Sequence, residues 1–228
     1  MNAMNPRPVG RTALPETDRS TPRRPGDGHR HAAASKPDTI RIGLGHHAVS
    51  DGADIMMTTT LGSCVAACIH DPVRGVGGMN HFLLPELPGT ERPETRLLGA
   101  GARYGSVAME RLINALLALG AERRRLRVKL FGGARVIESS CDIGGLNSRF
   151  ALDYISREGL MLAGQDLGGD SARRLQYFPH SGRAMRRLLH PDSLSGMMAQ
   201  ERRFMSGLQR RPIEGDVELF DPGLSGGS

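Results

Sequence analysis

A cysteine and a histidine lie seventeen residues apart in a stretch rich in glycine and threonine, TTTLGSCVAACIHDPVRGVGGMNHFLLP, at residues 58–85. A thiol paired with an imidazole is a nucleophile and base for acyl transfer, provided that the two side chains come within hydrogen-bond distance. Cys64 follows Gly62 and Ser63, and backbone N–H groups in such a turn can face a substrate carbonyl. These residue types indicate thiol chemistry at Cys64 with His81 as base, although composition and spacing alone are more typical of a structural cysteine.

The segment between Cys64 and His81 has the pattern of a β-hairpin. Residues 65–69 form a short apolar run of strand length, Asp71-Pro72 is a turn signal, and residues 76–84 form the returning strand. Adjacent strands would bring the thiol and the imidazole together, which is the geometry that the chemistry requires.

The remainder of the chain predicts several strands and two substantial helices. Apolar residues at helical spacing predict a helix at 104–119, and Asn147 is a suitable N-cap for a second helix that ends near residue 158. Strands are expected at 39–45, 126–131, 160–165 and 173–178, and a short basic helix at 181–189.

Composition favours one domain with loose ends, since the chain has 228 residues of which 39% are hydrophobic. We expect a disordered Arg- and Pro-rich tail at 1–37, a domain at 38–192 and a loosely structured tail at 193–228. Much of the net charge of +6 lies in the first tail, and no basic helix carries base-reading polar residues. Nucleic-acid binding is therefore not indicated.

The sequence has neither an apolar stretch of membrane-spanning length nor the apolar run of a signal peptide. We therefore expect a cytoplasmic protein without membrane insertion, whose three cysteines are free thiols.

The sequence gives little support for a metal or a nucleotide cofactor. Adjacent His46 and His47 cannot point the same way from a strand. A zinc site formed by Cys64, Cys68 and Cys141 is also not indicated. On one face of a strand, Cys64 and Cys68 would lie too far apart to bind the same tetrahedral zinc ion. The Gly132-Gly133 pair follows a strand but lacks the dinucleotide and P-loop fingerprints. We expect neither a metal site nor a cofactor site.

Further motifs extend well beyond the hairpin. They are Thr58-x2-Leu61-Gly62-Ser63-Cys64, Asp71-Pro72, Gly77-Gly78-Met79-Asn80-His81-Phe82, Tyr104-Gly105, Phe131-Gly132-Gly133-Ala134, Asp166-Leu167-Gly168-Gly169, Phe178-Pro179 and Ser181-Gly182-Arg183. Together they resemble the chemoreceptor glutamine deamidase family, CheD, over residues 39–189. One departure is Leu146, where similar sequences commonly have arginine.

The resemblance implies a fold and a set of catalytic residues. The fold is α+β, a three-layer arrangement of two β layers and a helical layer, similar to the deamidase domain of cytotoxic necrotizing factor toxins. The family's motif assigns the nucleophile to Cys64, the base to His81 and the third member of the triad to Thr58, which orients His81. No metal or nucleotide is implied.

The implied activity is that of a protein-glutamine glutaminase in chemotaxis adaptation. It converts glutamine to glutamate, through a thioester on Cys64, in the cytoplasmic domains of methyl-accepting chemotaxis receptors. Two alternatives stay open. The chain can act chiefly as a docking regulator of a CheC-type phosphatase, or as a cysteine-dependent amidase or transglutaminase on another protein.

Overall fold

The computed structural model describes residues 36–84, 100–136 and 142–190, together with Gly196, Ala199, Glu201, Arg203 and Phe204. The tail expected at 1–37 lies almost wholly outside these residues, as does Cys141. None of the described helices is long and apolar enough to span a membrane.

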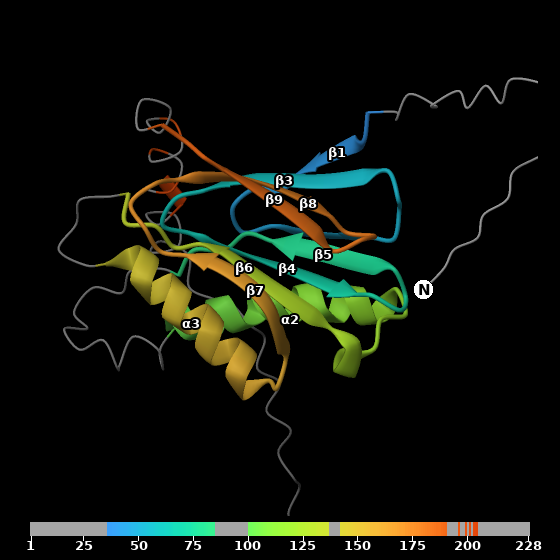
Figure 1. Cartoon of the computed structure of the whole chain (residues 1–228). Helices are drawn as coiled ribbons and strands as arrows, with labels where there is room; N and C mark the ends of the chain where they lie inside the picture. The colour runs from blue at the N-terminus through green and yellow to red at the C-terminus, as the bar shows by residue number, and fades with distance from the viewer. Residues whose placement is uncertain are drawn as a thin grey trace, which may run out of the picture. The chain divides into compact units, whose positions relative to one another are not determined.

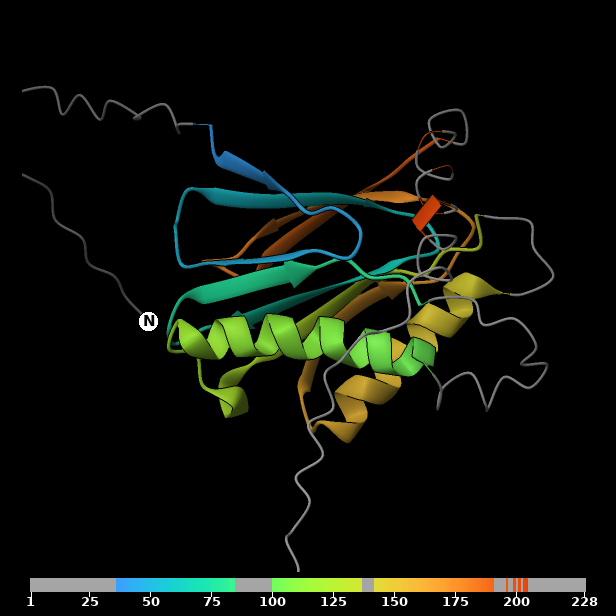
Figure 2. The same cartoon turned by 180° about the vertical axis from the view of Figure 1, so that it is seen from behind.

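Two β-sheets and a layer of helices stack on one another (Figures 1 and 2). One outer layer is a four-stranded sheet in the order β1-β3-β8-β9, and the middle layer is a five-stranded sheet in the order β2-β5-β4-β6-β7. The helices cover the far face of the middle sheet (Figure 2). The predicted α+β fold with two β layers and a helical layer is confirmed.

The element bounds are as follows. The outer sheet contains β1 (Asp38–Arg41), β3 (Ile55–Leu61), β8 (Arg173–Phe178) and β9 (Arg183–Leu188). The middle sheet contains β2 (His47–Ser50), β5 (Val76–Asn80), β4 (Val65–Asp71), β6 (Arg127–Gly132) and β7 (Met161–Leu167). The helices are α2 (Ala100–Ala118), the 3-10 turn η1 (Arg123–Arg125) and α3 (Ile143–Arg157).

Strand β4 is apolar along nearly its whole length because both of its faces are covered. Val65, Ala67 and Ile69 pack with the helices, whereas Ala66 and Cys68 pack between the two sheets. This period of two divides the core into two clusters. The predicted hairpin is confirmed, since β4 and β5 pair in antiparallel register.

Two predicted elements are wrong. Residues 183–188 form β9 rather than a helix, because pairing with β8 satisfies their backbone groups and Gly182 closes the turn at φ 67°. Asn147 does not cap α3, which begins four residues earlier. The N-cap is Asp142, whose carboxylate accepts a hydrogen bond of 2.9 Å from the Gly145 N–H.

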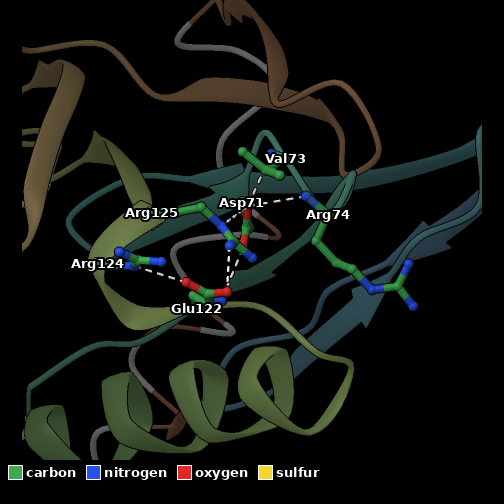
Figure 3. A network of polar contacts seen from close by, with 6 residues as sticks. All are labelled: Asp71, Val73, Arg74, Glu122, Arg124 and Arg125. Carbon is green, nitrogen blue, oxygen red and sulfur yellow. Dashed lines mark hydrogen bonds and ion pairs between the residues drawn. The ribbon is translucent and has the colours of Figure 1, made fainter.

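The turn after β4 is closed by the buried carboxylate of Asp71, shown in Figure 3. It accepts hydrogen bonds from the Val73 N–H at 3.0 Å, the Arg74 N–H at 3.1 Å and the Glu122 N–H at 2.9 Å. Arg125 adds an ion pair at 2.9 Å. Burial opposes charge on Asp71, but the hydrogen bonds from Arg125 and these N–H groups outweigh it and hold the Asp71 pKa below its usual range.

The Asp71→Asn variant should lose about 2–3 kcal/mol of unfolding free energy at neutral pH, the value of charge-assisted hydrogen bonds. Because the folded-state pKa is depressed, this stabilisation is present above the unfolded pKa of about 3.9 and is lost as pH falls toward the folded value. Urea unfolding at pH 7 and pH 3.5 should show a smaller difference between variant and parent at the lower pH. An equal difference at both would contradict this role for the Asp71 charge.

Candidate active site

The pairing of two strand ends brings Cys64 and His81 together. Val65 and Phe82 form an antiparallel bridge with two hydrogen bonds of 2.9 Å, so Cys64 and His81 become diagonal neighbours on one face. Cys64 Sγ lies 2.8 Å from His81 Nε2, and both side chains are buried between the sheets. The predicted contact between thiol and imidazole is present in the structure.

The loop that carries Cys64 is held by the glycine turn after β6. The Gly133 N–H donates to the Cys64 carbonyl at 2.7 Å, and the Ala134 N–H donates to the Gly62 carbonyl at 2.8 Å. Gly132 has φ 113°, and a Cβ there would lie 2.2 Å from the Cys64 carbonyl oxygen. This position therefore requires glycine, and the turn supports the loop that presents the thiol.

Asn147 links the same loop to the segment that follows His81. Its Nδ2 donates to the Ser63 carbonyl at 3.0 Å and to the Ile143 carbonyl at 2.9 Å. Its Oδ1 accepts from the Leu84 N–H at 2.8 Å. A fully buried amide thus fixes the separation of the two segments that carry the thiol and the imidazole. From the sequence alone we predicted only a helix cap at Asn147 and not this role.

The threonine that contacts His81 is the residue after the one predicted to orient it. His81 Nδ1 lies 2.9 Å from Thr59 Oγ1, whereas the Thr58 hydroxyl donates to the Leu175 carbonyl at 2.7 Å. Side chains alternate along β3, so Thr59 points between the sheets toward His81. In the structure, Thr59 contacts His81 and Thr58 does not.

The hydrogen bonds of Thr59 also determine the tautomer of His81. The Thr59 hydroxyl donates its one proton to the Ile42 carbonyl at 2.7 Å. Its oxygen is then an acceptor, and His81 must donate from Nδ1. The Nε2 lone pair of a neutral imidazole is therefore directed at the Cys64 thiol.

Burial and a neighbouring carboxylate set the charge state of the pair. Burial lowers the pKa of His81 to about 4, so the imidazole is neutral at physiological pH. Burial also raises the pKa of the Cys64 thiol, and the charge of Glu201 raises it further. A nearby imidazole ordinarily favours the thiolate, but the thiol stays protonated while Glu201 lies beside the sulfur.

The turn around Cys64 was expected to offer backbone N–H groups to a substrate carbonyl. The Val65 N–H is already bonded to Phe82. The Gly62 and Cys64 N–H groups each act to lower the pKa of the thiol, against the larger effects of burial and Glu201, so both donors lie beside the sulfur.

His81 also lines a cavity of about 650 Å³ at the outer sheet. Thr58 and Thr59 line it as well, and Arg41, Arg174 and Arg187 contribute positive charge. Among the described residues that line it there is no aspartate or glutamate. One side of the His81 imidazole therefore faces a positively charged cavity.

Glu201 occupies the site from the C-terminal region and was missed by sequence analysis. The Ser63 hydroxyl donates to Glu201 Oε2 at 2.6 Å, and Cys64 Sγ lies 3.0 Å from Oε1. Only 2% of Glu201 is exposed. A loose tail was expected at 193–228, but these contacts hold part of that region against the domain. The only sequence signal is the i, i+3 spacing of Glu201 and Phe204, which places them on one helical face.

Three relatives that are similar to this chain over most of its length carry the same name. The profile of the family described as "CheD chemotactic sensory transduction" matches residues 84–188. A protein of Halorhodospira halophila, 48% identical over 166 residues that cover 72% of this chain and 77% of its own, is named "Probable chemoreceptor glutamine deamidase CheD". The same name is given to a protein of Hydrogenovibrio crunogenus, 48% identical over 71% of this chain and 84% of its own.

A third relative, from Acidiphilium cryptum, also has this name and is 45% identical over 82% of this chain and 98% of its own. Among solved structures, that of a Neisseria meningitidis protein covers 59% of this chain and 64% of its own with 12% identity and a TM-score of 0.35, a weak similarity. The sequence relatives are matched over most of their length at well above 30% identity. The chain belongs to the CheD family.

Proposed function

We propose that this protein is a protein-glutamine glutaminase that hydrolyses glutamine side chains of methyl-accepting chemotaxis receptors to glutamate. The observation that carries the proposal is the 2.8 Å contact between the Cys64 thiol and an imidazole whose free lone pair faces it. The relatives, named probable chemoreceptor glutamine deamidases, supply the substrate class.

The first half of the reaction forms a thioester. His81 Nε2 takes the thiol proton as Cys64 Sγ attacks the side-chain amide carbon of a receptor glutamine. The Gly62 and Cys64 N–H groups stabilise the negative charge that develops on the amide oxygen. His81 then gives the proton to the amide nitrogen, the C–N bond breaks and ammonia leaves.

The second half hydrolyses the thioester. His81 accepts a proton from water, whose oxygen attacks the thioester carbon, and the C–S bond breaks. The proton returns to the sulfur, so the thiol is restored. Water is consumed, ammonia is released and glutamine becomes glutamate. These steps need no metal and no nucleotide.

The product differs from the substrate by one ionisable group. A new carboxylate on a receptor can serve as a methylation site, which connects the reaction to adaptation in chemotaxis. We place the reaction in the cytoplasm, on the cytoplasmic domains of the receptors. The arginines around the cavity beside His81 suit an approach by acidic segments.

Thr59 acts as a positioning residue in this scheme. The Thr59→Val variant should lower kcat about 10- to 100-fold with little change in KM, because it removes the nearer acceptor of the His81 Nδ1–H and leaves only the Ile42 carbonyl at 3.5 Å, a loss of about 1–3 kcal/mol. Thr59→Ser keeps the hydroxyl and should restore most of the activity. Steady-state kinetics on a receptor fragment measure both values.

Thr58→Val is the matched control from the same strand, since the Thr58 hydroxyl bonds to Leu175 and not to His81. We expect its kcat to stay within about threefold of the parent, as for a residue outside a catalytic contact. A large loss of kcat with Thr58→Val and a small loss with Thr59→Val would show that Thr58, not Thr59, positions His81.

The proposed activity is tested by measuring ammonia release from a receptor cytoplasmic fragment, with and without a primary amine. Release without incorporation of the amine indicates hydrolysis, and incorporation indicates a transglutaminase. Binding to receptors or to a CheC-type phosphatase without ammonia release would favour the docking regulator.

A further inference from the structure

Glu201 presents the chemical group that the proposed reaction produces. Its side chain is that of the product, glutamate, and its two carboxylate oxygens contact the nucleophile loop separately. Oε1 lies 3.0 Å from Cys64 Sγ, and Oε2 accepts the Ser63 hydroxyl proton at 2.6 Å. The thiol and the Ser63 hydroxyl thus each contact a different oxygen of one carboxylate, which lies directly against the nucleophile.

The segment that carries Glu201 is held in place by a second contact. The described residues Gly196, Ala199, Glu201, Arg203 and Phe204 have helical backbone. Phe204 is partly buried against the cluster between the sheets, and its ring contacts the ring of Tyr104 with centroids 6.2 Å apart. Arg203, between the two anchored residues, is exposed.

The segment is thus oriented with Glu201 and Phe204 toward the domain. In Figures 1 and 2 the short red piece lies at the same end of the two sheets as the start of α3, the helix whose Asn147 holds the Ser63 carbonyl.

We propose that Glu201 is an internal product mimic, which occupies the subsite for the glutamine side chain and holds the site closed until a receptor segment displaces it. This inference rests on the proposed function. It assigns Ser63 as the residue that binds the substrate side chain, through its hydroxyl to the amide oxygen. It also indicates that the substrate glutamine is presented from a helical segment, as Glu201 is.

Occupation by Glu201 has two chemical consequences. The carboxylate places a negative charge next to the sulfur, which disfavours the thiolate. It also fills the space into which a substrate amide must enter. Displacement by a neutral glutamine side chain removes both obstacles at once, so the thiol becomes reactive when substrate is present.

The most direct test converts the mimic into a substrate. In the Glu201→Gln variant, Cys64 should attack the side-chain amide introduced at position 201, release ammonia and hydrolyse the thioester, so that the residue there becomes glutamate. Peptide mass spectrometry should then find a gain of about 1 Da at that position, as expected for amide hydrolysis. The same variant with Cys64→Ala should keep glutamine there, which controls for spontaneous deamidation.

The outcomes separate this inference from the proposed function. If position 201 keeps glutamine while the same variant deamidates a receptor fragment, the product-mimic assignment is overturned and the glutaminase stands. If neither substrate is converted, both are overturned.

A second measurement addresses closure of the site. Glu201→Ala should raise the rate at which iodoacetamide alkylates Cys64 at least about tenfold, and should lower KM for the receptor fragment with kcat nearly unchanged, because an internal competitor is removed. Arg203→Ala, on the exposed side of the same segment, is the matched control and should change neither value. Equal alkylation rates in parent and Glu201→Ala would contradict closure of the site by Glu201.

Discussion

Replacing Cys64 with alanine is expected to reduce ammonia release from a receptor fragment to the uncatalysed rate, a loss of at least about 10⁴-fold by analogy with other removed nucleophiles. The other described cysteine, Cys68, is a poor substitute for it. Cys68 lies further along β4 and is buried in the core between the sheets, where burial raises the pKa of its thiol. The measurement is the initial rate of ammonia release at saturating substrate.

The control for this variant is its folded state. The thiol contributes packing in a buried position, so Cys64→Ala should be slightly less stable and otherwise intact, with a loss of about 1 kcal/mol. Thermal unfolding followed by circular dichroism checks this. A folded Cys64→Ala protein that keeps more than about a hundredth of the parent rate would be incompatible with the thioester route.

Replacing His81 with alanine is expected to lower kcat by about 10³-fold or more, since general base catalysis and thiol activation are lost together. His46 lies beside His81 in the fold, since its carbonyl accepts from the His81 N–H at 3.0 Å, but it is not placed to take over as base. His46, which precedes the strand that pairs with β5, directs its Nδ1 at the Leu44 carbonyl at 3.1 Å. Single-turnover kinetics separate this chemical defect from substrate binding.

The pH dependence of kcat/KM gives a second readout for His81. Burial lowers the pKa of His81 to about 4, and the base must be neutral to accept the thiol proton. Activity should therefore persist as pH falls through the ordinary histidine pKa of about 6.5 and decline only near pH 4. An acid limb centred near 6.5 would show that His81 does not act from this buried state.

The hairpin and the meeting of Cys64 with His81 followed from local patterns. Strand pairing depends on apolar runs and turn residues, and these are visible in the sequence. The threonine that contacts His81 was harder to predict. Thr58, Thr59 and Thr60 are consecutive, and only the register of β3 against its neighbours decides which of them points between the sheets.

Other parts of the site depend on contacts between residues distant in sequence. Asn147 bonds to Ser63, 84 positions away, and no spacing rule links a helical asparagine to a loop carbonyl. Glu201 reaches Ser63 across 138 positions from a region whose composition indicated a loose tail. The helix predicted at 181–189 is wrong for a similar reason. Pairing with β8 makes residues 183–188 a strand and outweighs their local helix propensity.

The central claim is that Cys64 hydrolyses receptor glutamines, and peptide mass spectrometry of a receptor cytoplasmic fragment tests it most directly. The fragment is incubated with the intact protein and, in parallel, with its Cys64→Ala variant. We predict a gain of about 1 Da at individual glutamines, the mass change of amide hydrolysis, with the intact protein only. Unchanged glutamines with the intact protein, in a fragment that it demonstrably binds, would contradict the claim.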